Sequence, residues 1–133
     1  MEKITINNQI ISIKLSDQGD EYISLTDLAK FKDLKFPARE VNNWMRSKNT
    51  IEFIGIWEKI NNIDFKLLEF EQFKKDSGNN SFVISPDRWI KNTDAIGIKS
   101  SSGRYGGTFA HKDIAFEFAM WISSEFKLYL IKE

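Results

Sequence analysis

Residues 94–122, DAIGIKSSSGRYGGTFAHKDIAFEFAMWI, contain two short extended segments followed by a long apolar one. Ile96 and Ile98 alternate with other residues, and an extended pattern resumes over 105–109, so we expect two antiparallel strands joined by a tight loop at 100–103. The almost continuous apolar run that follows predicts a helix over 112–123. This stretch therefore predicts a β-hairpin followed by the most buried element of the fold.

The N-terminal part of the chain predicts a second hairpin and a short helix. Residues 4–15 alternate loosely and 21–23 are apolar, which predicts an opening β-hairpin with its turn at Asp17-Gln18-Gly19-Asp20. Ser24-Leu25-Thr26-Asp27 has the spacing of a capping box and starts a helix over 25–31. The residues of that helix expected to face inward are Leu25, Leu28 and Phe31.

A second helix is predicted over 37–48, because Pro37 suits the first turn of a helix. At 100° per residue, Val41, Trp44 and Met45 share one face, which predicts that this face is core. The opposite face carries polar residues that point to solvent or to a ligand. They are Arg39, Asn42, Asn43 and Arg46.

The middle of the chain is less regular. Residues 49–57 are apolar with weak alternation and indicate either a strand or an irregular packed segment. Asp64 is the expected cap of a helix over 65–75, with Leu67, Phe70 and Phe73 inward. Ser85-Pro86 opens a further short helix through Trp89 and Ile90. The side chains expected in the core of the whole domain include Trp44, Trp89, Phe118 and Trp121.

Composition excludes several classes of protein. The chain has 133 residues, enough for one domain with its own core, and it has no cysteine, so disulfides, cysteine zinc sites and thiol nucleophiles are excluded. There is no apolar run long enough for a membrane span and no signal peptide, so we expect a cytoplasmic protein. The single histidine, His111, suits a structural role at a helix start, and no metal, cofactor or enzymatic site is predicted.

Charge is unevenly distributed along a chain whose net charge is zero. Residues 28–48 hold six basic and two acidic residues, and 88–112 hold five and one, so each segment has a net charge of +4. Such segments are often solvated faces, but they also fit contact with a polyanion.

The hairpin belongs to the second basic segment. With a four-residue loop, Lys99 and Arg104 become direct cross-strand partners, an unfavourable pairing that either solvent would screen or a bound phosphate would relieve. A helix pair at 25–31 and 37–48 followed by a basic hairpin is the layout of a winged helix-turn-helix. The alternative is an ordinary amphipathic helix with a polar solvent face.

Several segments resemble the KilA-N domain of phages, large DNA viruses and bacteria. They are YISLTDLAK at 22–30, WMRSKNTIEFIGIWE at 44–58, SPDRWI at 85–90 and, most specifically, GRYGGTFAHKDIAFEFAMWISSEFKLYLIKE at 103–133. That family is similar to the APSES DNA-binding domains of fungal transcription factors. The resemblance implies one α+β domain over 1–133 with a winged helix-turn-helix and a hairpin over 99–108. A helical pattern over 125–133 ends without a cap, which predicts that the chain continues beyond Glu133.

The resulting hypothesis is that the protein binds double-stranded DNA and regulates transcription in a phage or mobile element. In it, helix 37–48 reads bases in the major groove, and the hairpin over 99–108 either clamps phosphate or reaches into the minor groove. The candidate contact residues are Arg39, Asn42, Asn43, Arg46, Lys48, Lys99, Ser100, Ser101, Ser102, Gly103, Arg104, Tyr105 and Lys112. The rival hypothesis is an antirepressor-like adaptor that binds a protein and not DNA.

Overall fold

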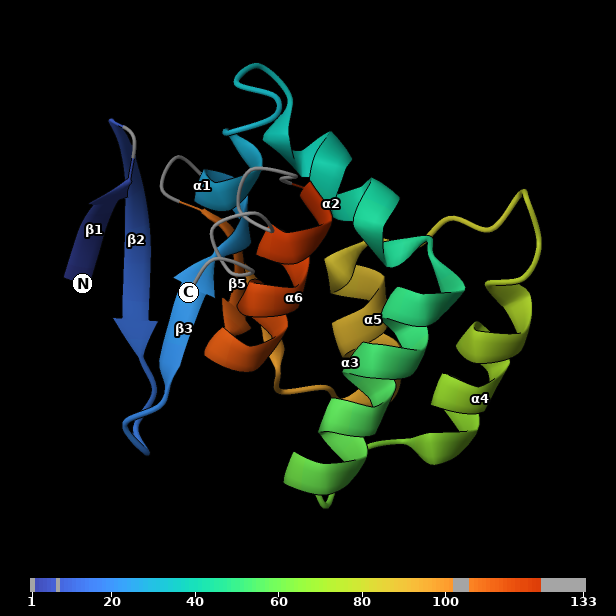
Figure 1. The fold of residues 1–133 in the computed structure, drawn as a ribbon. Coiled ribbons are helices and arrows are strands. Elements are labelled where there is room, and N and C mark those ends of the chain that lie inside the picture. Colours follow the sequence, from blue (N-terminus) through green and yellow to red (C-terminus); the bar gives the residue numbers. More distant parts are fainter. Residues whose placement is uncertain (1, 7, 102–105, 123–133) are drawn as a thin grey trace.

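The computed structural model describes residues 2–6, 8–101 and 106–122. These residues form one α+β domain with a five-stranded antiparallel sheet and six helices (Figure 1). The strands are β1 (Glu2–Ile6), β2 (Gln9–Leu15), β3 (Glu21–Ser24), β4 (Ile98–Ser101) and β5 (Gly107–His111). The helices are α1 (Leu25–Ala29), α2 (Pro37–Met45), α3 (Lys48–Asn61), α4 (Leu67–Asp76), α5 (Pro86–Thr93) and α6 (Lys112–Ile122).

The N-terminal region forms three strands where the sequence predicted one hairpin. The second turn is where it was expected: Gly19 there has a φ of +88°, and its N–H donates to the carbonyl of Ser16. An additional turn separates β1 from β2, with Asn8 at a φ of 68°. Asparagine tolerates this left-handed conformation better than most residues, so Asn8 was the missed signal.

Strand order in the sheet is β1-β2-β3-β5-β4, so the C-terminal hairpin pairs with the N-terminal strands through β3 and β5. One face carries the row Ile13, Ile23, Ala110 and Ile98, which are successive cross-strand partners. Ala110 and Ile98 belong to the core that the sheet shares with the helices. In Figure 1 the helices lie to one side of the sheet, with α4 farthest from it.

Two helix starts agree with the capping predictions. The Ser24 hydroxyl accepts a hydrogen bond from the Asp27 N–H at 3.0 Å, and the Ser85 hydroxyl accepts one from Arg88. The Asp27 carboxylate accepts from the Ser12 N–H at 2.8 Å, which ties α1 to β2. Phe31 is exposed, contrary to the prediction, because α1 ends at Ala29 and Phe31 lies in the turn beyond it.

Residues 49–57 form neither a strand nor an irregular segment. They are part of α3, and the predicted second helix ends at Met45, before α3 begins. Gly55 of α3 lies so close to the Phe70 ring of α4 that a Cβ at this position would collide with the ring. The buried residues Ile51, Ile54 and Glu58 of α3 recur at helical spacing, but the other apolar residues between them hide this period in the sequence.

Helix α4 begins two residues later than predicted. Its N-cap is Lys66 and not Asp64, and Leu67 is half exposed because it is the first helical residue. The other two predicted inward residues, Phe70 and Phe73, are buried.

Aromatic side chains fill much of the core. Trp44, Trp89 and Phe118 are fully buried, as predicted. Trp121 is 39% exposed and corrects the prediction, because it lies in the last described turn of α6. One face of its ring stacks on Phe118, with ring centroids 6.2 Å apart, and the Lys32 ammonium lies 5.0 Å from its centroid.

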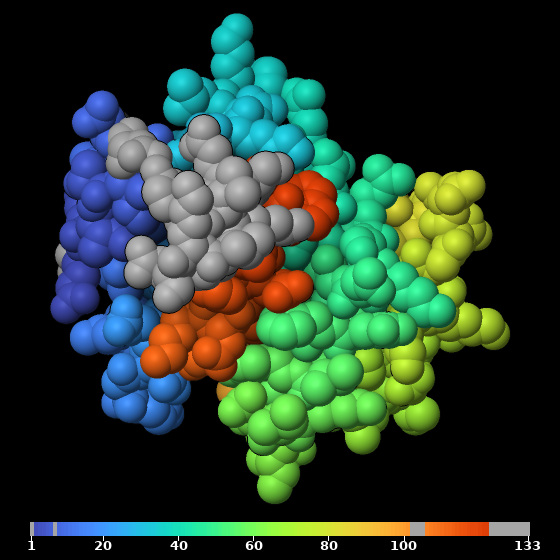
Figure 2. Space-filling view, in the orientation of Figure 1, coloured from blue at the N-terminus to red at the C-terminus, as the bar shows by residue number. Residues whose placement is uncertain are grey.

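The junction between α3 and α6 also carries a polar contact. The indole Nε1 of Trp57 in α3 donates to the carboxylate of Asp113 in α6 at 3.2 Å. Figure 2 shows the green and orange segments of the chain in contact at the surface. No helix among the described residues is both long enough and apolar enough to cross a membrane.

Candidate nucleic-acid interface

An open groove of about 740 Å³ lies between α2 and the end of the β4–β5 hairpin. We call it the α2 groove. Its α2 side includes Arg39, Asn42, Asn43 and Arg46, and its hairpin side includes Ser100, Ser101, Gly107 and Thr108. The structure therefore brings together six of the predicted contact residues from two segments about 55 positions apart in the sequence.

The orientation of α2 follows from its amphipathic pattern. Val41, Trp44 and Met45 are buried in the core, as predicted. Because these side chains hold one face of the helix against the core, the opposite face is exposed and carries the arginines and asparagines.

The lining of the α2 groove is positively charged. Three cationic side chains contribute to it, Lys35, Arg39 and Arg46, and none of its described lining residues is acidic. Lys35 was missed as a site residue, although it lies in the first basic segment; its position just before Phe36-Pro37 was the available signal. The local concentration of cations favours a polyanionic ligand.

The polar side chains of α2 differ in the contacts that they already make within the protein. Arg46 donates from Nε to the carbonyl of Phe82 at 3.1 Å and from Nη2 to that of Asn80 at 3.3 Å, so it also holds the loop after α4. Arg39 lies over the Phe36 ring, 4.8 Å from its centroid. In the described part of the chain the side-chain amides of Asn42 and Asn43 make no hydrogen bond, so they are available to a ligand.

The hairpin register differs from the prediction. Lys99 pairs with Phe109, not with Arg104, because the described ladder runs from the Ile98–Ala110 pair to the Ser101–Gly107 pair. Ser100 and Thr108 share the face that opens into the α2 groove, whereas Lys99 lies on the opposite face of the ladder. The Ser100 hydroxyl donates to the Asp87 carboxylate at 2.9 Å and so is partly engaged.

Two other predicted contact residues lie apart from the α2 groove. Lys48 is the exposed first residue of α3, and Lys112 is the exposed first residue of α6, where it borders an apolar hollow near β1. Four further predicted residues, Ser102, Gly103, Arg104 and Tyr105, lie outside the described residues, as does the helical pattern predicted over 125–133.

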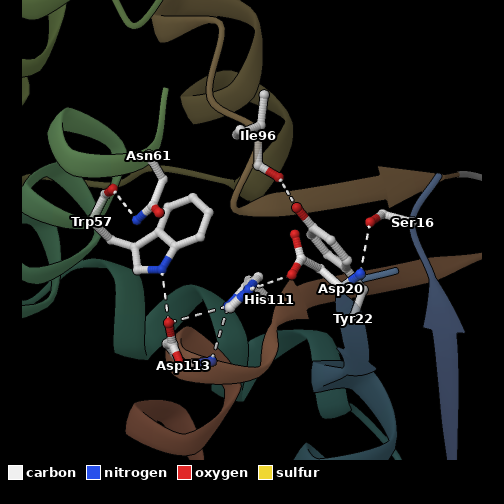
Figure 3. Close-up of polar contacts among 8 residues, drawn as sticks. All are labelled: Ser16, Asp20, Tyr22, Trp57, Asn61, Ile96, His111 and Asp113. Carbon is white, nitrogen blue, oxygen red and sulfur yellow. Dashed lines mark hydrogen bonds and ion pairs between the residues drawn. The ribbon is translucent and has the colours of Figure 1, made fainter. Parts of the chain in front are cut away.

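His111 belongs to a separate polar cluster at the end of β5 (Figure 3). Its Nδ1 accepts from the Asp113 N–H at 3.2 Å, and its Nε2 lies 3.8 Å from the Asp20 carboxylate. The ring packs against Tyr22 and Trp57, with centroids 5.7 and 4.9 Å away. Together with the hydrogen bond from Trp57 to Asp113, these contacts join β5 to α6 and α3.

Tyr22 belongs to this cluster and has a raised pKa. Its hydroxyl donates to the carbonyl of Ile96 at 2.9 Å, as Figure 3 shows. Burial raises the pKa of Tyr22 above its usual value of 10.0, and the nearby carboxyl groups of Asp20 and Glu58 raise it further. Each of these influences disfavours the phenolate.

We therefore expect the protein to lose stability at alkaline pH in part through Tyr22. A pKa that is higher in the folded state than in the unfolded state contributes stability below about pH 10, and this contribution disappears as the pH rises through the folded-state value. Urea unfolding at pH 8 to 11 should show this decline. Tyr22→Phe should start about 1 kcal/mol less stable, because the hydrogen bond to Ile96 is lost, but should decline less with pH. An equal decline in both proteins would contradict the assignment.

The sequence matches the model of a known domain family. No curated protein and no solved structure shows significant similarity to the chain. The family model of the KilA-N domain matches residues 4–133, which is nearly the whole sequence. KilA-N domains are, as a family, DNA-binding domains. With a match of this extent, the chain belongs to the KilA-N domain family.

Proposed function

We propose that the protein binds double-stranded DNA through the α2 groove, as a regulator of transcription in a phage or mobile element. The observation that carries the proposal is the meeting of α2 and the β4–β5 hairpin around one groove with three cationic residues and no described acidic residue in its lining. DNA affinity depends strongly on the placement of such cations near phosphates.

The side chains of α2 suit base recognition in the major groove. Arginine fits the O6 and N7 edge of guanine, and asparagine fits the N6 and N7 edge of adenine. Arg39, Asn42 and Asn43 are exposed on one face of a helix anchored by its buried residues, so the helix can present them to base edges. We assign Arg46 to contact with the DNA backbone and not with base edges, because two of its donors are already bonded to the carbonyls of Asn80 and Phe82.

The proposed arrangement is a winged helix-turn-helix in which α1 and α2 are the helix pair and the β4–β5 hairpin is the wing. Helices α1 and α2 pack on each other, and Thr26 of α1 accepts a hydrogen bond from the Thr108 N–H of β5 at 3.0 Å. This contact sets the hairpin beside the helix pair. The connection over 30–36 is longer than the three or four residues of the standard motif.

Substitutions on α2 should weaken binding to a preferred DNA sequence more than binding to random DNA. On a duplex enriched from a random pool, Arg39→Ala or Asn43→Ala should each weaken binding by about 1 to 3 kcal/mol, roughly 5- to 150-fold, and much less on random duplex. The measurement is fluorescence anisotropy of labelled duplex at fixed salt. Asn92→Ala on α5 is the matched control, because Asn92 is exposed and away from the α2 groove.

Equal losses on the selected and random duplexes would show that α2 contacts only the backbone. Wild-type protein that binds no duplex at 50 mM salt would refute DNA binding altogether.

The rival function is a protein-binding adaptor, and one observation favours it. Exposed apolar side chains gather where α3 ends and α4 begins, a composition typical of contact with another protein. They are Ile56, Ile60, Ile63, Leu67 and Leu68. If the wild-type protein fails to bind duplex, this surface becomes the better candidate.

A further inference from the structure

The face of the sheet opposite the core row carries two lysines over two aromatic rings. Cross-strand pairing places Lys14, Tyr22 and His111 in one row of this face, and Phe109 and Lys99 in the next. The Lys14 ammonium lies 4.2 Å from the centroid of the Phe109 ring, and the Lys99 ammonium lies 4.5 Å from that of Tyr22. The two cations thus come from strands that are distant in the sequence but close in the sheet.

Neither ammonium is neutralised by an acidic partner. In the described portion of the chain, Lys14 and Lys99 form no ion pair, whereas Lys30, Lys32, Lys66 and Lys91 each pair with a carboxylate. The ring face attracts the charge but accepts hydrogen bonds only weakly, so most of the three donors of each ammonium remain available.

The two lysines border a hollow of about 280 Å³, together with the hydroxyl-bearing residues Ser16 and Ser101. Cations and hydroxyl groups around a small hollow suit a phosphate, which accepts several charge-assisted hydrogen bonds. The hollow adjoins the α2 groove at the edge strand β4, because Ser100 and Ser101 line both. A strand of DNA that passes over the end of the hairpin would meet both surfaces.

We propose that Lys14 and Lys99 form a phosphate clamp on the outer face of the sheet, which binds the backbone of the same duplex that α2 reads. The inference rests on the proposed DNA binding. It assigns a role to Lys14, although residues 1–27 hold five acidic and only two basic residues. It also gives Lys99 a role separate from that of the α2 groove.

The test is the salt dependence of binding to a random-sequence duplex. Each phosphate contact that is lost lowers the slope of log affinity against log salt by about 0.9. Lys14→Gln and Lys99→Gln should each lower the slope by about that amount between 50 and 200 mM salt, and the double variant by about twice as much. The loss should be equal on selected and random duplexes, because a phosphate contact carries no sequence information.

Matched variants separate charge from packing. Lys14→Arg and Lys99→Arg keep both the cation and the cover over the ring, so they should retain the wild-type slope. Lys75→Gln on α4, an exposed lysine remote from both hollows, should also leave the slope unchanged. Thermal unfolding of each variant checks that the fold is intact.

The outcomes distinguish this proposal from the DNA-binding proposal. Unchanged slopes for the glutamine variants, with weakened binding for Arg39→Ala, would overturn the clamp and leave DNA binding in place. A lower salt slope for Lys99→Gln together with an unchanged slope for Lys14→Gln would also overturn the clamp, because the clamp requires Lys14. Wild-type protein that fails to bind duplex at 50 mM salt would overturn both.

Discussion

Replacing Glu58 with alanine should lower the free energy of unfolding by about 1 to 4 kcal/mol, because the buried N–H group of Gly97 would lose its acceptor at about 1 to 3 kcal/mol and the part-buried N–H group of Ile96 would lose its acceptor at a smaller cost. Glu58 is fully buried near the end of α3. Its carboxyl oxygens accept from the N–H groups of Ile96 at 3.0 Å and Gly97 at 2.7 Å, just before β4. They also accept from the Asn62 side-chain amide at 2.9 Å. Urea unfolding followed by circular dichroism measures the loss.

The packing around Gly97 explains why this contact is so close. A Cβ at Gly97 would lie 2.8 Å from a carboxyl oxygen of Glu58 and 2.6 Å from the Ile114 side chain. Only glycine therefore lets the backbone reach the carboxyl group. Glu58→Gln keeps the shape and one acceptor and should lose less stability than Glu58→Ala. The exposed Glu71→Ala on α4 should stay within about 0.5 kcal/mol of wild type. A loss for Glu58→Ala as small as that of Glu71→Ala would contradict the role of the carboxyl group.

Phe118→Ala should destabilise the protein by about 3 to 5 kcal/mol, the usual range for removing a buried phenylalanine. Phe118 is fully buried on α6 and meets the Trp44 ring of α2 edge to face, with centroids 5.1 Å apart. The substitution would leave a cavity between the helix that packs on the sheet and the helix proposed to read DNA. The midpoint and slope of urea unfolding provide the measurement.

A control for Phe118 is the phenylalanine whose predicted burial was wrong. Phe31 is 41% exposed in the turn after α1, so Phe31→Ala should cost much less than Phe118→Ala. If both substitutions had the same effect, the assignment of Phe118 to the core and of Phe31 to the surface would be wrong.

Local signals in the sequence identified several elements correctly. Ser24 and Ser85 each cap a helix through a hydrogen bond to a residue three positions ahead, so a short segment contains all the atoms involved. The buried face of α2 was also predictable, because the spacing of Val41, Trp44 and Met45 specifies one side of a helix. The exposed position of Arg39 and Asn43 follows directly from that spacing.

Other features depend on contacts between distant segments. In α3, apolar residues lie on the exposed face as well as on the buried face, so residues 49–57 show no clear local pattern, and Gly55 packs against Phe70 of another helix. The register of the hairpin is another case: a four-residue loop was a reasonable expectation, but the strands pair Lys99 with Phe109. A change of register alters every cross-strand partner, so the prediction of a Lys99–Arg104 pair was wrong.

The sequence by itself determined the family, the α+β class and the polar face of α2, because these depend on motifs and on periodicities within single segments. Only the tertiary structure decided which cations share a surface. It joined Lys35 to Arg39 in the α2 groove and placed Lys99 beside Lys14 on the opposite face of the hairpin. The physical reason is that strand pairing and helix packing bring together residues whose separation along the chain carries no information about their distance in space.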